Sequence, residues 1–383
     1  MKFLKKLLKY LVVFFVLFIA ILYITDTDYL LKAVRTIYLK GHSTAYLEDY
    51  KQFENQSIAA SSNPQAWPNH ANYNLVEETE RLKNANTDWG TIAYVIIKND
   101  SVWFENYYDG FDENSKSNSF SMAKSYVSGL LGKAIMEGYI KSLDQPVCDF
   151  LPAFCDDKAT KMTVGDLSSM ASGTNWEEAY YSPLSITTRA YFDDDLAKVM
   201  NGLEVVDVPG KTYKYASGDT QMLAMVIEKA TGKKLYKYLE ESFWKPLGSE
   251  NDVLWQVDSE DHDLVKAYCC LASNAKDFAR FGKLYKDYGK WNGQRLLDSA
   301  FVAKSLTPRF EESPQYGYGW WMLTLNGKTF DMMRGHLRQY VIVQPEDNII
   351  IIRLGHQKSP DGTQPFTDDI SLYIEEAYKM LSE

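Results

Sequence analysis

The sequence is poor in histidine, cysteine and basic clusters, and each scarcity excludes a class of function. Five histidines are scattered over 383 residues, and no Cys-x-x-Cys pattern occurs. We therefore expect no metal and no cofactor. The formal net charge is -10, and the lysine-rich start of the chain is not continued elsewhere. Such a chain repels phosphates, so we expect no nucleic-acid partner. The content of 45% hydrophobic and 14% aromatic residues instead predicts a well-packed globular protein.

Long apolar runs are also scarce, and the clearest one stands at the N-terminus. Four lysines precede an uncharged stretch from Tyr10 to Ile24. A cleaved signal peptide is one interpretation, since its apolar region has ~7–15 residues. No Ala-x-Ala pattern follows, however, and with Leu7 and Leu8 the run approaches the ~17 residues that span a bilayer. We favour an uncleaved anchor over residues 1–25. In both cases the lysines stay in the cytoplasm and the body is exported.

Export bears on the four cysteines, because an oxidising compartment permits disulfides. Cys148 and Cys155 flank a short loop and are able to bridge each other, whereas a bond between the neighbours Cys269 and Cys270 would be strained. Four buried free thiols are an equal alternative.

Strand patterns occur near both ends of the body, and helical patterns fill its middle. A polar helical stem follows the anchor over residues 26–55, and residues 57–72 have the composition of a loop. A β-hairpin is expected around the turn signal Asn99-Asp100. Helices are predicted over 121–139, 218–231, 273–288 and 368–381, and C-terminal strands within 316–324, 328–334, 338–345 and 348–354.

This order predicts an α/β (α+β) fold. Its sheet is mostly antiparallel and built from N- and C-terminal segments, with helices on its faces and a large helical insertion at about 112–306. We expect an anchor at 1–25, a stem and linker at 26–74 and a catalytic body at 75–383. A cleft between the sheet and the helical part is a natural pocket.

The pattern Ser-x-x-Lys occurs three times, and two copies have structural explanations. Ser242 and Lys245 lie directly before a proline that ends their helix. Ser273 has the position of a helix N-cap, with Lys276 exposed to solvent.

The third copy, Ser121 and Lys124, opens a helix whose next turns are apolar. Positions i and i+3 share a helix face, ~5–6 Å apart. Burial and the helix dipole both lower the pKa of Lys124, and a neutral lysine is able to take a proton from a serine nucleophile. The alternative is an ordinary N-cap serine beside a lysine that extends to solvent.

Two later stretches add candidates. Tyr215 and Ser217 precede an apolar helix, where the phenol can relay a proton and the hydroxyl can donate a hydrogen bond. His336 stands at the entrance to an edge-like strand. Each candidate also has a structural interpretation. Tyr215 is then an ordinary member of the 27 tyrosines, Ser217 only caps the helix, and His336 is a surface histidine.

In this order these segments resemble the serine β-lactamase and penicillin-recognising superfamily. The likeness is to its class C and DD-peptidase-like side, and within that to the branch of 6-aminohexanoate-dimer hydrolases and related esterases. It extends from about residue 75 to the end of the chain. Supporting phrases are MTVGDLSSMASGTNWEE, LASNAKDFARFGKLY, WNGQRLL, YGYGWW and the hairpin from Gly335 to Gly355.

The resemblance implies a role for each candidate residue. Ser121 is the acylated nucleophile, Lys124 its general base and Tyr215 the proton relay. His336 stands in the third motif of the family, and the backbone N–H groups of Ser121 and Gln339 form an oxyanion hole.

Further residues are implied with less specific roles. Trp176 and Tyr180, on a loop that borders the cleft in the family, are candidate substrate contacts, with an ordinary surface loop as the alternative. Ser217 is a third candidate contact. No metal is implied.

The third motif departs from the family pattern. It contains His336-Leu337-Arg338, so a hydroxyl is lost at Leu337 and a glycine is replaced by Arg338. Ser217 also stands where β-lactamases have asparagine. Antibiotic hydrolysis is therefore not expected. Arg338 either narrows the cleft, binds an acidic substrate end, turns away, or marks a degraded site.

We therefore predict an exported, membrane-anchored serine hydrolase that cleaves a small amide through an acyl-enzyme on Ser121. We expect it in a bacterial cytoplasmic membrane, with the catalytic body on the periplasmic or extracytoplasmic side. The alternatives are an esterase of the same fold and a non-catalytic, penicillin-binding-type sensor of the cell envelope.

Overall fold

A six-stranded antiparallel sheet carries the body of the protein, in the order β3-β2-β12-β11-β10-β9. The computed structural model describes residues 1–356 and 366–383. The sheet joins segments from both ends of the body, as the sequence predicts. Its strands are β2 (Thr91–Lys98), β3 (Ser101–Tyr107), β9 (Trp321–Leu325), β10 (Lys328–Gly335), β11 (Gln339–Gln344) and β12 (Ile349–Gly355).

The predicted hairpin is present between β2 and β3. Its turn residues Asn99 and Asp100 both have left-handed backbone, with φ of 51° and 60°, the conformation that tight hairpin turns require. Side chains alternate between the two faces of β2. Val95 and Ile97 belong to the main core, and Tyr94 and Ile96 to a second core on the opposite face.

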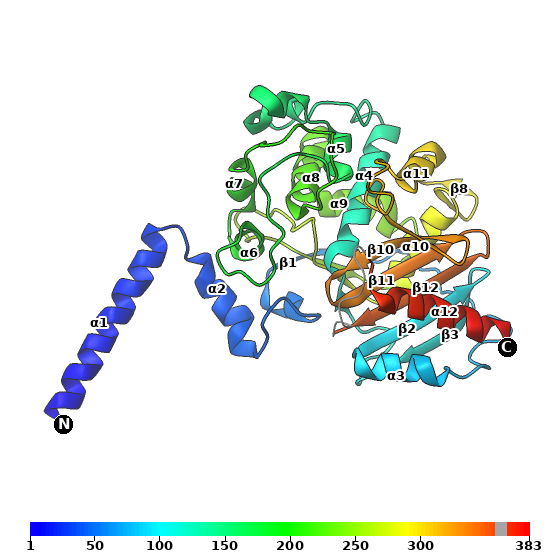
Figure 1. Cartoon of the computed structure of the whole chain (residues 1–383), viewed down its shortest axis with the longest axis horizontal. Coiled ribbons are helices and arrows are strands. Elements are labelled where there is room, and N and C mark those ends of the chain that lie inside the picture. The colour runs from blue at the N-terminus through cyan, green and yellow to red at the C-terminus, as the bar shows by residue number, and fades with distance from the viewer. Residues whose placement is uncertain (357–365) are drawn as a thin grey trace.

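Helices cover both faces of the sheet (Figure 1). Helices α3 and α12 pack on the outer face, and α10 lies against β2, β11 and β12 on the inner face. Behind α10 lies the helical part, with α4 at its centre. The helices of the body are α3 (Glu80–Asp88), α4 (Ala123–Met136), α5 (Val164–Ser168), α6 (Ile186–Phe192), α7 (Leu196–Asn201), α8 (Ser217–Thr231), α9 (Leu235–Leu239), α10 (Ala275–Lys286), α11 (Ser299–Ser305) and α12 (Asp368–Ser382).

A second sheet was not predicted from the sequence. It has the order β1-β5-β6-β4, and its strands are two to four residues long, too short for an alternating pattern to stand out. Its strands are β1 (Asn55–Ile58), β4 (Ser117–Asn118), β5 (Val253–Gln256) and β6 (Leu271–Ser273); a small hairpin pairs β7 (Lys290–Trp291) with β8 (Gln294–Arg295).

The N-terminal helix α1 (Lys2–Ile24) extends away from the body (Figure 1). By its length and composition it is able to cross a membrane. The segment after it differs from the predicted polar stem. Helix α2 (Tyr29–Thr36) buries Tyr29 and Ala33 in the main core, and Ile37 directly follows them. This 26–55 segment therefore packs on the body, because one face of α2 is apolar at a spacing of four residues.

Candidate active site

Ser121 lies in a one-turn 3-10 helix, Phe120–Met122, that leads directly into α4. The Lys124 Nζ atom is 2.8 Å from the Ser121 Oγ atom and donates to the Tyr268 carbonyl at 2.9 Å. Just before the serine, Phe120 has a φ of 45°, which is disfavoured for a bulky residue. The Asn118 side chain fixes this bend by accepting the Phe120 N–H at 2.9 Å. The spacing that the sequence suggested thus places the amine and the hydroxyl in contact.

In the other two Ser-x-x-Lys pairs the lysine forms an ion pair with a glutamate. Lys245 donates to Glu240 at 2.7 Å. Lys276 pairs with Glu113, and its side chain is only 17% exposed, so the expectation of a solvent-exposed lysine is wrong. Ser273 ends β6 and the helix cap is Asn274, whose side chain accepts from a backbone N–H at 2.8 Å.

The charge state of Lys124 results from two opposing effects. Burial lowers the pKa of the Lys124 amine from 10.5 to about 8, against a smaller upward effect of the nearby Glu178 carboxylate. A charged amine loses hydration when it is buried, which favours the neutral form. At pH 8 about half of the Lys124 amine is therefore neutral and able to accept a proton.

Tyr215 joins this pair from the loop before α8. Burial raises the pKa of the Tyr215 phenol well above its usual value, against a smaller lowering effect of the Ser121 hydroxyl. The Lys124 Nζ atom lies 5.1 Å from the centre of the Tyr215 ring. Because the phenol stays protonated, Tyr215 is suited to pass a proton on rather than to act as the initial base.

Glu178 is a site residue that sequence reasoning missed. Its carboxylate accepts the Ser217 N–H at 2.8 Å and the Ser217 hydroxyl at 2.6 Å. It also accepts the Trp176 indole N–H at 2.7 Å and the Tyr180 hydroxyl at 2.6 Å. Its partner Ser217 is 39 positions away in the chain, so no local pattern identifies this contact. The adjacent acidic residues of the Trp-Glu-Glu phrase were the available signal.

These bonds locate three further predicted residues. Ser217 lines the cavity but uses its proton on Glu178, so its oxygen is left as an acceptor rather than the expected donor. Tyr180 also lines the cavity. Trp176, expected to contact substrate, is fully buried instead. Gly218 explains this, because a Cβ there would meet the Trp176 ring at 2.5 Å.

The third motif lies in the turn between β10 and β11. His336 lines the cavity, with its ring 5.3 Å from the Phe120 ring and 5.4 Å from the Tyr180 ring. The expectation of an edge strand is wrong, since β11 pairs with both β10 and β12. Gly335 permits the close approach of this turn to the nucleophile's segment, because a Cβ there would lie 2.2 Å from the Ser119 carbonyl oxygen.

A buried arginine holds this turn from behind. Leu337 and Arg338 both have left-handed backbone, with φ of 57° and 66°. The Arg353 guanidinium, which is 1% exposed, donates to their carbonyls at 2.8 and 2.9 Å. Arg338 itself points toward Asp369, at 4.0 Å, and does not line the cavity. Of the four possibilities for Arg338, this geometry favours the one in which it turns away from the cleft.

Gln339 is completely buried at the start of β11. Its side chain bonds backbone groups, including a donation to the Gly355 carbonyl at 2.5 Å. The side chain is therefore not free for a substrate. The oxyanion-hole role predicted for this residue concerns only its backbone N–H.

One cavity contains the candidate nucleophile. Ser121, Ser217, Tyr268, Cys269 and His336 line one part of it. Within the described residues, no cluster of three His, Cys, Asp or Glu side chains is placed to hold a metal.

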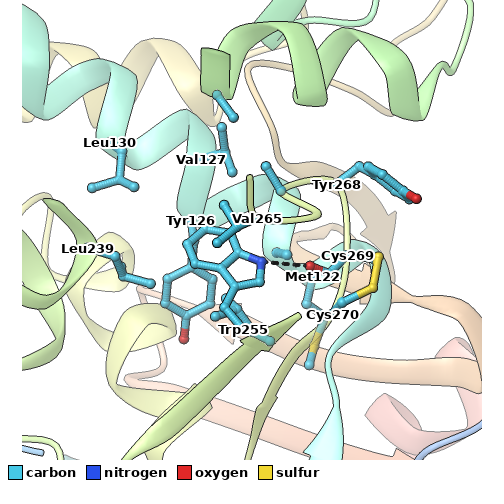
Figure 2. Close-up of a cluster of buried hydrophobic side chains, with 14 of the residues drawn as sticks. Met122, Tyr126, Val127, Leu130, Leu239, Trp255, Val265, Tyr268, Cys269 and Cys270 are labelled. Atoms are coloured by element: carbon cyan, nitrogen blue, oxygen red, sulfur yellow. Dashed lines mark hydrogen bonds between the residues drawn. A yellow bond between two sulfur atoms is a disulfide. The ribbon is translucent and has the colours of Figure 1, made fainter. Parts of the chain in front are cut away.

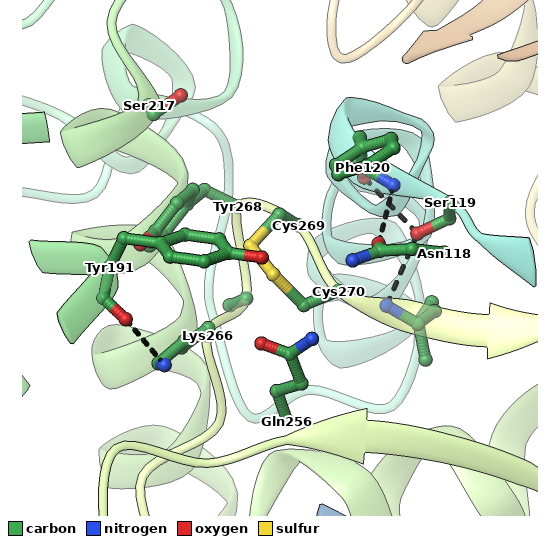
Figure 3. Close-up of a disulfide and its surroundings, with 12 residues drawn as sticks. Asn118, Ser119, Phe120, Tyr191, Ser217, Gln256, Lys266, Tyr268, Cys269 and Cys270 are labelled. Carbon is green, nitrogen blue, oxygen red and sulfur yellow. Dashed lines mark hydrogen bonds between the residues drawn. A yellow bond between two sulfur atoms is a disulfide. The ribbon is translucent and has the colours of Figure 1, made fainter. Parts of the chain in front are cut away.

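The floor of the cavity contains a disulfide between neighbours. Cys269 bonds to Cys270, and Cys148 bonds to Cys155, so the alternative of free thiols is wrong for all four. Cys270 has a φ of 77°, a backbone conformation that residues with a Cβ disfavour. Figure 3 shows this disulfide near the rings of Tyr191 and Tyr268.

The backbone of this floor is fixed by a large core. The Trp255 indole N–H donates to the Cys269 carbonyl at 2.9 Å. Figure 2 shows Tyr126, Val127 and Leu130 of α4 around this indole. Helix α4 and the segment that supplies the Tyr268 carbonyl therefore share one packed cluster, which keeps Lys124 beside its two partners.

Comparison of the chain with protein families, sequences and solved structures finds related hydrolases in each case. The model of the Beta-lactamase family matches residues 76–372. The 6-aminohexanoate-dimer hydrolase of Paenarthrobacter ureafaciens is 25% identical over 310 residues, which cover 75% of this chain and 77% of that protein. A structure titled "Putative 6-aminohexanoate-dimer hydrolase from Bacillus anthracis" has a TM-score of 0.76 at 19% identity, covering 88% of this chain and 92% of that one. A D-stereospecific amidohydrolase from Streptomyces sp. has a TM-score of 0.55 at 19% identity, covering 71% and 91%.

Proposed function

This chain belongs to the beta-lactamase family, and from that premise we propose that it cleaves a small amide through an acyl-enzyme on Ser121. The observation that carries the proposal is the 2.8 Å contact between the Ser121 hydroxyl and the Lys124 amine, whose pKa burial lowers to about 8. A serine becomes a useful nucleophile when an adjacent base takes its proton. Ser121 lines a cavity that is open to solvent.

The first half of the reaction forms the acyl-enzyme. The Ser121 oxygen attacks the carbonyl carbon while Lys124 accepts the serine proton. The backbone N–H groups of Ser121 and Gln339 bind the oxyanion, each donor contributing about 3–4 kcal/mol to the transition state. The C–N bond then breaks, and the amine leaves with a proton delivered through Tyr215 or His336.

The second half returns the enzyme to its starting state. A water molecule attacks the acyl-enzyme and gives up its proton to the same base. The bond to the Ser121 oxygen breaks, the acid is released, and the serine regains its proton. The high pKa of Tyr215 supports a relay that starts and ends each cycle protonated.

The relatives support an amide as substrate. The Paenarthrobacter protein is named for hydrolysis of a 6-aminohexanoate dimer, and the Streptomyces protein is named an amidohydrolase. The changed third motif, with Leu337 and Arg338 in left-handed backbone, favours such substrates over penicillins. An esterase is the second candidate, because esters release their alcohol without the protonation that an amine needs.

We further propose that residues 1–25 anchor the protein in the bacterial cytoplasmic membrane, with the body on the extracytoplasmic side. The support is helix α1, which is 23 residues long, strongly apolar and almost wholly exposed, together with the lysines at its start. In this organisation residues 26–74 connect the anchor to a catalytic body at 75–383.

A labelling experiment tests the proposal. The full chain in detergent is incubated with a fluorophosphonate probe and with nitrophenyl esters and nitroanilides, and the adduct is located by mass spectrometry. We expect a label on Ser121, turnover of both substrate types, and loss of both in Ser121→Ala. The matched control is Ser242→Ala, in another Ser-x-x-Lys pair, which keeps label and turnover.

Each other result contradicts part of the proposal. Turnover of esters without anilides identifies an esterase. A label on Ser121 without turnover identifies a binding protein or sensor of the cell envelope. No label on Ser121 rejects the serine nucleophile altogether.

A further inference from the structure

The cavity that contains Ser121 has a wall from outside the family region. The stem segment before residue 76 lines it with Ala33, Ile37, Tyr38, Ser43, Thr44 and Ala45. The opposite wall comes from α6 and from the loop over residues 180–183. The nucleophile and the stem thus face the same space.

The stem is held in this position by contacts of several kinds. The Tyr29 hydroxyl donates to the Pro183 carbonyl at 3.1 Å, which joins the stem to the loop of the opposite wall. Lys32 pairs with Asp194 at 2.5 Å. Phe53 packs edge-on against Tyr191 of α6, with ring centres 5.3 Å apart.

A buried carboxylate adds the firmest attachment. Asp49 has no exposed surface, and it accepts the Tyr191 hydroxyl at 2.5 Å, the Asn118 amide at 3.0 Å and the Gln256 amide at 3.1 Å. These partners come from α6, β4 and β5. Such a network is costly to break, because moving Asp49 away would leave its buried partners without a hydrogen bond. The stem is therefore a fixed part of the cavity.

The chemistry of the lining restricts what enters. Among the described residues that line this cavity, none is Asp, Glu, Lys or Arg, and most of the exposed lining is apolar. Aromatic rings, including Phe120, Tyr180, Tyr191 and Phe192, form a large share of it. A charged substrate group would lose hydration here, and apart from His336 it would find no counter-charge in the lining.

We infer that the stem is a specificity-determining wall, and that the enzyme selects an amide with an uncharged, apolar aliphatic or aromatic group lying between stem and α6. This inference rests on the proposed function of Ser121 and adds the substrate class to it. It distinguishes the chain from an enzyme for a zwitterionic linear dimer, which carries a charge at each end.

The test compares two substrate series on the full chain in detergent. In one series the acyl group of a nitroanilide or nitrophenyl ester lengthens from acetyl to octanoyl. In the other, the amine of an acetyl amide lengthens in the same way. In at least one series kcat/KM of the wild type should rise about fourfold for each methylene that enters the cavity. A terminal carboxylate or ammonium should lower it at least tenfold.

Two stem variants then change the wall in opposite directions. Tyr38→Ala removes a half-exposed lining ring and should move the preferred length upward. Thr44→Trp fills the cavity and should lower kcat/KM for the longest member at least tenfold while sparing the acetyl member. The matched controls are Leu39→Ala and Lys40→Trp, whose exposed side chains do not line the cavity, and they should keep the wild-type length profile.

Labelling of Ser121 by a small fluorophosphonate separates the two possible failures. If wild type and variants are all labelled but the stem variants keep the wild-type length profile in both series, or if charged substrates are preferred, the inference is wrong and the serine hydrolase remains. If the wild type is not labelled at Ser121, the proposed function itself fails.

Discussion

Lys124 and Lys266 are two lysines with equally buried amines, and they differ in one further contact that each amine makes. Burial lowers the pKa of both. Each also donates to a backbone carbonyl, Lys124 to Tyr268 at 2.9 Å and Lys266 to Tyr191 at 2.6 Å. Lys124 additionally contacts the Ser121 hydroxyl, whereas Lys266 lies 3.9 Å from the centre of the Phe53 ring.

The difference shows that a lowered pKa does not by itself make a catalytic base. Structural amines in a core experience the same loss of hydration. A base also needs a proton donor within hydrogen-bond distance and a space for the substrate beside it. Lys124 satisfies both conditions through Ser121 and the cavity. The Lys266 amine instead lies in the core, where it donates to the Tyr191 carbonyl (Figure 3).

Exchange of each lysine for methionine gives the largest expected effect. Lys124→Met should lower kcat/KM by about 10²–10⁴, the usual contribution of a general base. Lys266→Met should change kcat/KM less than tenfold, because this amine contacts no reacting group. Initial rates with a nitroanilide measure both, and circular dichroism checks that each variant is folded. Equal losses in the two folded variants would remove the distinction between the lysines.

The pH dependence of the rate sharpens the same comparison. In the proposed mechanism the neutral form of Lys124 is the base, and the pKa of this amine is about 8. Hence kcat/KM should rise with pH and level off above about pH 8. Lys266→Met should keep this inflection, because the relevant proton is on Lys124. A profile without an inflection near 8 in the wild type would show that another group takes the serine proton.

The smallest expected effect is on stability. We expect Lys124→Met to raise the free energy of unfolding although it lowers activity. The pKa of Lys124 falls from 10.5 in the unfolded chain to about 8 in the folded one, so burial of the charged amine opposes folding at neutral pH. Lys124→Met should therefore increase the free energy of unfolding at pH 7 by about 1–3 kcal/mol.

Between pH 8 and 10.5 the unfolded wild type holds a proton that the folded form has lost, so wild-type stability rises with pH and the gap closes. Urea denaturation at pH 7 and pH 10 measures both values. A less stable Lys124→Met at pH 7 would show that the hydrogen bonds of the amine outweigh its desolvation.

The contact between Ser121 and Lys124 was predictable from the sequence because the pair is local. Ser121 and Lys124 are three positions apart at the start of an apolar helix, so helix geometry alone brings them together. The β2–β3 hairpin was equally local. Its turn residues Asn99 and Asp100 tolerate left-handed backbone, and the alternating strands fix the two faces.

The parts that were missed depend on contacts between distant segments. Glu178 acquires its role only when the loop that carries it meets the start of α8. Trp176 was expected to contact substrate because nothing local shows that Gly218 packs against its ring. The spacing of Tyr29, Ala33 and Ile37 did signal an apolar helix face, but a pattern of this kind does not identify the surface that the face covers.

The boundary of the family region has an evolutionary consequence. The residues proposed to transfer protons lie inside residues 76–372, while part of the cavity wall precedes that region. Mutations in the leading segment can therefore alter which molecules enter without disturbing the machinery that breaks the bond. New preferences are thus open to selection at little risk to turnover, and a leading segment exchanged between homologues would bring its selectivity with it.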